Sequence, residues 1–469
     1  MKRPAFAALP LCLAALLSGP VGSSAQTSGS FNRTGSGARA AGMGNAFVAV
    51  SDDGTAATWN PAGLAQLRKP ELAFVYSAFG RSAALEGYRT LDDRFTFTPR
   101  RGGEASQFID FASLAIPLTI LRPVTFQVGW RRLYSLDTGL GGSFLREPTG
   151  LAPEGPVTGF ATRLDGDGSV DIVSLAAAMR VTRRLSLGLS VNLWDGGWEF
   201  RESTRQRVEG EPADFLDFGQ RQGAKGTNLN FGMMLHLPSW RAGVVYHAPM
   251  DAAFRSTSTL DSTLPPPGLE LEATLPEEAR MRFPTSLGMG ASWKPEPRWT
   301  VALDATWDEW REWTIDGPGL EAPVNFSDGE TVDRTSTRNT ISFNAGAEWI
   351  LQRPGFLVPF RFGLAHEPQG PRDPVLFTGY ALELITVGVG YNTNRFKLDV
   401  ALQRGWFDVR QTDSISIESE LRSALAEEPL PDSVGLRQER FWRLKVSAIL
   451  RIVDTEGLQR TLGRIFGGS

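Results

Sequence analysis

The sequence predicts an all-β fold, namely a fourteen-stranded antiparallel transmembrane β-barrel that holds an N-terminal segment in its lumen. Segments of roughly 10–14 residues, such as residues 340–349, alternate apolar with polar side chains, and this period of two gives a strand two different faces. The gaps between these segments are alternately short and long. Tight periplasmic turns and long outer loops are typical of barrels in the bacterial outer membrane, which is the predicted location.

The chain begins with the features of a secretory signal peptide, which we predict over residues 1–25. Lys2 and Arg3 form a charged end, and the apolar run that follows is too short to cross a membrane as a helix. A small-residue cleavage site ends at Ala25. The only cysteine, Cys12, lies inside the apolar run without the small residue that should precede a lipidated cysteine, so the mature chain is expected to lack cysteine.

Composition excludes several classes of function. The net charge is −4 and no basic block occurs, which argues against a nucleic-acid partner. The three histidines form no metal-spaced pair and accompany no nucleophile-elbow motif, so we expect no enzyme activity, no cofactor and no metal site. The 50 glycines and 13 tryptophans fit a membrane barrel better than an ordinary soluble domain.

We predict the barrel over residues 70–452 and a short tail, with the spacing of one apolar helix face, over residues 453–469. An even number of strands closes the sheet and leaves no edge in lipid. The predicted strands lie near 71–79, 107–118, 123–134, 169–181, 184–198, 226–237, 239–249, 281–293, 298–310, 338–350, 356–366, 381–392, 395–407 and 440–452. The predicted outer loops lie near 80–106, 135–168, 199–225, 250–280, 311–337, 367–380 and 408–439.

Aromatic residues lie near the ends of these strands, as two interfacial girdles would. Those near short turns are Trp240, Trp293, Trp299, Trp349, Tyr391 and Phe396, and those towards long loops are Trp130, Trp194, Trp307 and Trp406. A soluble β-sandwich with core tryptophans is the alternative, but its strands are shorter and its loops do not sort by parity. Four tryptophans beside outer loops offer either interface anchors, which we favour, or a capture surface for lipophilic ligands: Trp198, Trp307, Trp310 and Trp313.

Two strands depart from a clean alternation. The strand near 71–79 is apolar on both faces, so we expect one face to pack against the N-terminal segment inside the barrel. The strand near 107–118 has a blurred period and contains Pro117, which indicates either a β-bulge or an incorrect register.

Residues 26–69 read as a compact hatch or plug rather than as a strand. Small residues dominate, so that backbone can pack against backbone, and two glycines permit turns that other residues resist. Two aspartates can cap a short helix near Thr55, and a proline ends it. The candidate hatch or gate residues are Gly42, Gly44, Asp52, Asp53, Asn60, Pro61 and Ala62.

This stretch resembles the FadL-type outer-membrane transporters of hydrophobic compounds, which include long-chain fatty-acid and aromatic-hydrocarbon transporters. The matching residues are Gly37 to Arg39, Ala41 to Gly44, Asp52, Asp53 and Asn60 to Leu64. The resemblance implies a hatch with an Asn-Pro-Ala loop, a fourteen-stranded barrel in contact with outer-membrane lipid, and passive uptake of a hydrophobic small molecule that adsorbs near the outer loops. The motif also fits PorV- and PorQ-like barrels, which implies as an alternative a scaffold with a secretion-system or surface protein as partner.

Charged residues on the polar face of the predicted strands are candidate ligand contacts. Arg131, Arg180, Arg361 and Lys397 have the parity of the lumen, where one could hold a carboxylate-bearing ligand. Pairing with the acidic residues of the same parity is the alternative, and those residues are Asp304, Asp308, Glu348 and Asp399. The acidic run over 165–171 resembles a calcium loop but lacks the distal glutamate, so we expect a solvated turn there.

Overall fold

The computed structural model describes residues 35–90, 96–99, 102–119, 123–135, 138–146, 158–263, 271–274, 279–317, 320–370, 379–411 and 433–452. The predicted signal peptide, the start of the predicted hatch and the predicted tail lie outside these residues. No helix in the described ranges is long and apolar enough to cross a membrane.

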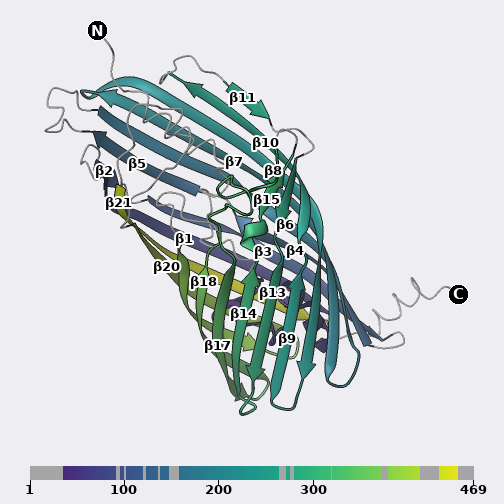
Figure 1. Ribbon diagram of the computed structural model, residues 1–469. Helices are drawn as coiled ribbons and strands as arrows, with labels where there is room; N and C mark the ends of the chain where they lie inside the picture. The colour runs from purple at the N-terminus through teal and green to yellow at the C-terminus, as the bar shows by residue number, and fades with distance from the viewer. Residues whose placement is uncertain are drawn as a thin grey trace, which may run out of the picture.

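One antiparallel sheet contains all the strands (Figure 1). The strands are β1 Glu71–Thr90, β2 Thr96–Pro99, β3 Gly102–Thr119, β4 Pro123–Ser135, β5 Thr138–Arg146, β6 Thr158–Arg180, β7 Leu185–Val208, β8 Glu211–His236, β9 Trp240–His247, β10 Met250–Ser262, β11 Leu271–Thr274, β12 Arg280–Phe283, β13 Ser286–Trp293, β14 Trp299–Asp308, β15 Thr314–Asp316, β16 Val324–Asn325, β17 Thr340–Arg353, β18 Phe356–Pro368, β19 Ala381–Asn392, β20 Phe396–Gln411 and β21 Ser433–Arg451. The helical elements are α2 Ala38–Gly42 and three short 3-10 helices, η2 Ala56–Thr58, η3 Pro61–Gln66 and η4 Trp310–Glu312.

The sheet closes on itself, because β1 pairs with β3 on one side and with β21 on the other. The β1–β21 ladder runs from Glu71–Arg451 to Thr90–Ser433. Around the wall the order is β1, β3, β4, β6, β7, β8, β9, β13, β14, β17, β18, β19, β20 and β21, which confirms the predicted fourteen-stranded antiparallel barrel.

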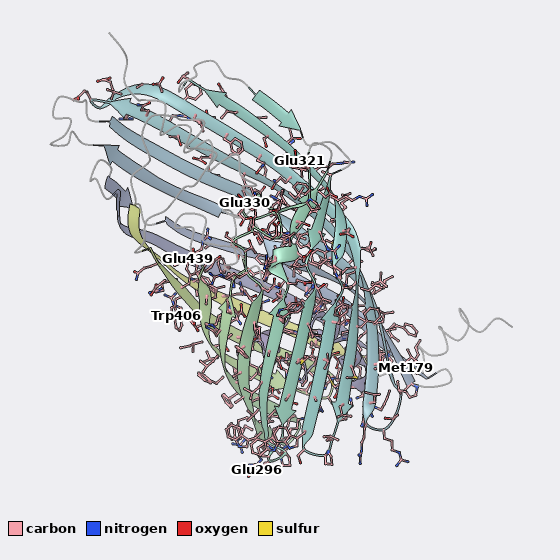
Figure 2. The ribbon with its side chains drawn as sticks, viewed as in Figure 1. Met179, Glu296, Glu321, Glu330, Trp406 and Glu439 are labelled. Atoms are coloured by element: carbon pink, nitrogen blue, oxygen red, sulfur yellow. The ribbon has the colours of Figure 1, made fainter. Side chains whose placement is uncertain are left out.

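The strands have the predicted polar and apolar faces. In β7, Ser186 and Ser190 are buried on the inner side, whereas Leu187, Leu189 and Leu193 are exposed on the outer side. The same alternation continues around the barrel, so the outer wall carries an apolar belt suited to lipid. Short turns join β6 to β7, β8 to β9, β13 to β14, β17 to β18 and β19 to β20, at the end where Figure 2 shows Glu296.

Several predicted outer loops contain strand, and the predicted loop over 199–225 is wrong. β7 and β8, of 24 and 26 residues, run far beyond the roughly 9–11 residues that cross a bilayer. They meet in a two-residue turn at Glu209 and Gly210, both with positive φ. Cross-strand ion pairs, such as Arg205–Asp217 at 2.7 Å, stabilise the extension, and Figure 1 shows it passing the ends of β17 and β18.

Two further predictions need correction. The acidic run over 165–171 is not a turn, because β6 continues through it in register with β7. The predicted strand over 281–293 is two strands, β12 and β13, separated at Pro284. Proline has no N–H to donate, so the ladder breaks there, and β12 pairs with β10 and β15 while β13 pairs with β9 and β14.

The two irregular strands behave as the sequence indicated. Ala73 and Val75 of β1 are buried on the inner side, where Ala73 packs close to Gly54 of the N-terminal segment. The β1–β3 register shifts between Ile109 and Phe111, so β3 carries a bulge at Asp110. Because of the bulge, Asp110 and Phe111 are both buried although they are adjacent in sequence.

The aromatic residues near short turns lie on the outer surface, as the predicted girdle requires. Trp240 and Trp293 stack with centroids 5.6 Å apart, and Tyr391 and Phe396 lie 5.7 Å apart. The aromatic residues predicted towards the long loops do not all lie on the outer surface, since Trp194 is buried on the inner side of β7. The predicted outer girdle is therefore incomplete on this side of the barrel.

Candidate functional site

Residues 35–70, which we call the lumen segment, lie inside the barrel and contact its inner wall. None of residues 35–67 is exposed. The segment begins with α2, turns at Gly44 and Asn45 through consecutive positive φ angles of 63° and 65°, and ends with η2 and η3. A positive φ favours glycine at position 44, as its place in the sequence indicated.

The predicted gate residues Asn60, Pro61 and Ala62 form the start of η3. Asn60 is extended, with a φ of −152°, as the following proline requires, and its Oδ1 accepts a hydrogen bond from the Ala62 N–H at 3.1 Å. Asn60 Nδ2 donates to the carbonyls of Val48 at 3.2 Å and of Met233 in β8 at 3.1 Å. Asn60 therefore links two parts of the lumen segment to the wall.

Wall side chains hold the backbone of the lumen segment. Asp304 of β14 is buried, and its Oδ2 accepts hydrogen bonds from the backbone N–H groups of Phe47 at 2.6 Å and Val48 at 2.7 Å. Asn344 of β17 donates to the Gly44 carbonyl at 2.8 Å, and Gly44 N–H donates to Thr386 Oγ1 of β19 at 3.0 Å. Side chains of three wall strands, β14, β17 and β19, thus hold one turn of the segment.

Wall glycines make room for this backbone. A Cβ at Gly243 of β9 would lie 2.6 Å from the carbonyl oxygen of Val48, and one at Gly363 of β18 would collide with the backbone nitrogen of Gly44. Both separations are too short for any other residue, so the wall and the lumen segment approach through bare backbone. The wall glycines in such contacts are Gly188, Gly232, Gly243, Gly346, Gly363 and Gly388.

A buried ion network joins the lumen segment to the wall. Arg39 donates to both carboxylate oxygens of Glu348 at 3.0 Å, and to Asp52 at 2.5 Å. Arg361 contacts Glu348 and Asp399 at 2.7 Å each. Burial raises the pKa of the Asp52 carboxyl, but nearby cations outweigh burial and hold its pKa well below its usual range: Arg39, Arg241 and Lys397.

The predicted gate residues therefore lie at the contacts between the lumen segment and the wall. Gly42 packs against Gly388 of β19, Asp52 belongs to the ion network, and Asp53 accepts hydrogen bonds from Thr55 ahead of η2. Their role in gating stays a prediction.

The four predicted ligand contacts are in three different surroundings. Arg361 is enclosed by its carboxylate partners, as the pairing alternative expects. Arg131 is buried on the inner side of β4. Arg180 and Lys397 line one recess at the short-turn end of the barrel. A contact of any of the four with a ligand stays a prediction.

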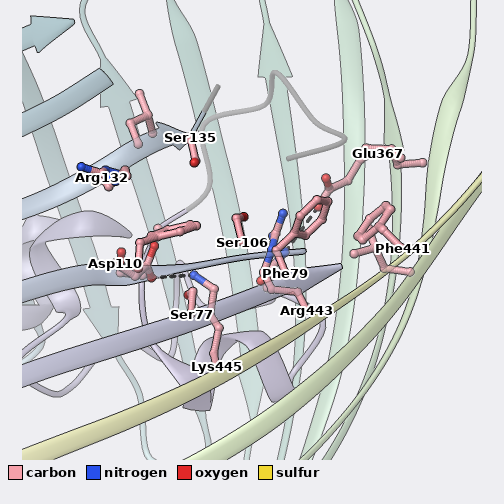
Figure 3. A pocket seen from close by; sticks show the side chains of 17 residues that line it. Ser77, Phe79, Ser106, Asp110, Arg132, Ser135, Glu367, Phe441, Arg443 and Lys445 are labelled. Atoms are coloured by element: carbon pink, nitrogen blue, oxygen red, sulfur yellow. Dashed lines mark hydrogen bonds and ion pairs between the residues drawn. The ribbon is translucent and has the colours of Figure 1, made fainter. Parts of the chain in front are cut away.

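A cavity of about 50 Å³ lies between the lumen segment and the wall (Figure 3). Its apolar lining comes from Phe79, Phe108, Leu382, Leu384 and Phe441, and its lining from the lumen segment comes from Gly35, Ser36 and Asn45. Lys445 of β21 contacts Asp110, the bulged residue of β3, at 2.6 Å. The Arg443 guanidinium lies over the rings of Phe79 and Phe441, at 5.6 and 5.9 Å. The cavity combines apolar side chains with charged groups of both signs, since Asp110 and Glu367 line it beside Arg132, Arg443 and Lys445.

Beside this cavity, the pairing between β3 and β4 ends. The β3–β4 ladder runs from Thr119–Pro123 to Phe111–Arg131 and ends there. Beyond that point β3 pairs with β1, and β4 pairs with β6, in the described residues. Residues from both diverging edges line the cavity, among them Phe108 and Arg132.

A second apolar region fills the inner side of the wall from β4 to β12 and borders the cavity at Leu133. Trp310 and Trp313 of the segment after β14 fold inward, and Trp313 packs against Phe283 at 6.1 Å and Phe326 at 4.7 Å. Trp198 belongs to the same cluster. The predicted interface anchoring of Trp198, Trp310 and Trp313 is therefore wrong, because their large apolar rings are buried in the protein interior rather than facing lipid.

Comparisons with known proteins agree with this architecture. The family described as outer membrane protein transport protein (OMPP1/FadL/TodX) matches residues 142–427. Among solved structures, a FadL homologue from Pseudomonas aeruginosa has a TM-score of 0.62 at 14% identity, covering 89% of this chain and 98% of the homologue.

Two toluene transporters have similar folds. TbuX of Ralstonia pickettii has a TM-score of 0.53 at 15% identity, covering 90% of this chain and 100% of TbuX. TodX of Pseudomonas putida has a TM-score of 0.55 at 12% identity, covering 90% of this chain and 99% of TodX. The curated protein sequences give no match. At these identities the solved structures establish the fold alone.

Proposed function

Because this chain belongs to the OMPP1/FadL/TodX family of outer membrane transport proteins, we propose that it takes up a hydrophobic compound, such as a long-chain fatty acid or a hydrocarbon, passively through the barrel. The lumen segment acts as a hatch in this proposal. A passive route fits a barrel whose apolar sites lie inside the wall, since an apolar solute partitions into such sites without an energy source.

The cavity between the lumen segment and the wall is the observation that carries this proposal. Its Phe and Leu side chains suit an apolar ligand, and Arg443 suits an acidic head group, whereas Lys445 is paired with Asp110 in the described conformation. Its volume of about 50 Å³ is far below the roughly 300–1,000 Å³ of sites that enclose a drug-sized ligand. The described conformation is therefore closed, and a ligand passes only after the hatch or the adjacent wall moves.

The contacts of Asn60 make the start of η3 a suitable gate. Its amide joins Val48 of the hatch to Met233 of the wall, and Pro61 fixes the backbone next to it. A small rearrangement here would release both contacts together. The diverging edges of β3 and β4, which line the same cavity, offer a lateral path that avoids displacing the whole hatch.

The experiment compares uptake of a labelled fatty acid with leakage of a small polar dye in cells that produce Asn60→Ala/Pro61→Ala. We expect uptake to fall while barrel abundance and dye leakage stay unchanged. The matched control is Glu296→Ala/Pro297→Ala in an exposed short turn, which should behave as the parent protein.

Raised dye leakage with unchanged uptake would mean that the lumen segment only blocks the barrel and does not gate uptake. Unchanged uptake and leakage, together with reduced surface display of other proteins, would contradict transport and favour the secretion scaffold.

A further inference from the structure

We propose that a basic recess at the short-turn end of the barrel binds the oxyanion of a carboxylate or phosphate head group. The recess has a volume of about 380 Å³ and is distinct from the cavity described above. Six cationic side chains line it: Arg68, Arg180, Arg183, Arg241, Lys397 and Arg451. Asp52 is the one carboxylate in the lining, so positive charge is in excess there.

Elements far apart in sequence supply these cations. Arg68 follows η3 of the lumen segment, Arg180 is the last residue of β6, and Arg241 is near the start of β9. Lys397 and Arg451 come from the adjoining ends of β20 and β21. Several like charges in one concave, partly enclosed site raise the local potential and attract anions.

Most of this charge is not neutralised by the protein. Arg241 contacts Asp52 at 3.4 Å, and Arg451 contacts Glu71 at 3.0 Å. Asp52 is also shared with Arg39 of the ion network. The other four cations have no carboxylate within 4 Å in the described part of the chain, and three of the four are exposed: Arg68, Arg180 and Arg183.

Lys397 is the strongest single indication of a ligand. Its side chain lines the recess although the residue is only 7% exposed, and its ammonium has no hydrogen bond or ion pair with any described residue. Asp399, two positions further along the same face of β20, is paired with Arg361 instead. The stem of Lys397 is buried while its ammonium opens onto the recess, so an oxyanion there would supply a charged hydrogen-bond partner.

The chemistry of the lining selects the class of ligand. Arginine presents a planar fork that matches two oxygens of a carboxylate or phosphate, and lysine adds a compact charge. This inference rests on the proposed function only where the oxyanion belongs to transported cargo. In that case the recess receives the acidic end of a fatty acid after it has passed the hatch.

The recess is also connected to the hatch. Arg241 contacts Asp52, and Asp52 contacts Arg39, which holds the wall residue Glu348. An oxyanion bound by Arg241 competes with Asp52 for the same guanidinium. Removing the Asp52 charge should therefore strengthen anion binding, whereas removing a recess cation should weaken it.

The test is titration calorimetry of the full-length protein in a non-ionic detergent at low salt, with inorganic phosphate, dodecanoate and dodecanol as probes. Lys397→Met/Arg180→Gln should weaken anion binding at least ~10-fold, because a hydrogen bond to a charged group contributes roughly 1.5–3 kcal/mol. Dodecanol binding should not change. Arg395→Gln, in an exposed turn beside β20 and outside the recess, removes one positive charge elsewhere and should bind as the parent protein does.

Asp52→Asn provides a change of opposite sign and should tighten anion binding several-fold. A merely damaged barrel would not gain affinity, so this variant separates a site from a folding defect. Loss of both phosphate and dodecanoate binding in the double variant would mean that any small oxyanion suffices. Loss of dodecanoate binding alone would mean that the head group must carry an acyl chain.

Unchanged anion affinity in the double variant, or an equal loss in Arg395→Gln, would overturn the recess proposal. Failure of the proposed function looks different. If anion binding responds as expected but cells gain no uptake of any lipophilic compound, the recess proposal is supported and the transport proposal is contradicted. If uptake occurs and these substitutions leave anion affinity unchanged, the transport proposal is supported and the recess proposal is contradicted.

Discussion

Replacing Asp304 by alanine should detach one turn of the lumen segment from the barrel wall. The Asp304 carboxylate is 5% exposed and accepts the backbone N–H groups of Phe47 and Val48 at 2.6 and 2.7 Å. The alanine variant leaves both donors buried without this acceptor. No strand ladder is changed, so the barrel itself should still assemble.

The size of the effect follows from these two bonds. A hydrogen bond to a charged acceptor contributes roughly 1.5–3 kcal/mol, so losing two costs about 3–6 kcal/mol. Since 1.4 kcal/mol is a factor of ten, the detached population should rise by about 10²- to 10⁴-fold. Asp304→Asn keeps one carbonyl acceptor without the charge and should show a smaller rise.

Hydrogen exchange measured by mass spectrometry on peptides that cover residues 46–50 reports this population directly. We expect much faster exchange in Asp304→Ala, with strand peptides unchanged, and increased leakage of a polar dye from proteoliposomes. Asp251→Ala on the exposed face of β10 is the control and should exchange as the parent protein. Equal protection of residues 46–50 in Asp304→Ala and the parent would refute the reasoning.

Three further predictions follow from the packing and topology. Gly363→Val should raise dye leakage, because its side chain would collide with Gly44, whereas Gly197→Val, with nothing within 4 Å, should not. Arg361→Met should lower the unfolding temperature on heated gels, because Asp399 would stay buried without its cation while Glu348 keeps only Arg39, at a cost of about 3–5 kcal/mol. In intact cells an impermeant thiol reagent should label Ser327→Cys and not Ser239→Cys, and the reverse pattern would invert the topology.

The barrel could be predicted from sequence because strand period and loop parity are local signals. Fourteen strands form the wall as predicted, although the predicted strand over 281–293 divides into β12 and β13, and the blurred period near 107–118 corresponds to the bulge at Asp110. The extension of β7 and β8 was missed because alternating charged residues read as a polar loop. Only the pairing of strands reveals that Arg205 and Asp217 neutralise each other.

The site was less predictable, since its contacts join residues far apart in the chain. Nothing local distinguishes Gly363, which a hatch backbone touches, from Gly197, which faces open space. The parity rule placed Arg361 and Lys397 on the same inner side, yet one is enclosed by carboxylates and the other lines a recess. Asp304 was one of the acidic residues offered as alternative ion-pair partners, whereas its partners are backbone N–H groups.

Facilitated entry of a hydrophobic compound is the central claim, and an initial-rate uptake measurement tests it most directly. Cells that lack other transporters of this kind would produce the full-length protein or carry an empty vector, and would receive a labelled long-chain fatty acid or a labelled monoaromatic hydrocarbon. We expect the protein to raise the uptake rate of at least one of the two without raising entry of a polar dye. Equal rates with and without the protein, at normal barrel abundance in the outer membrane, would contradict the account.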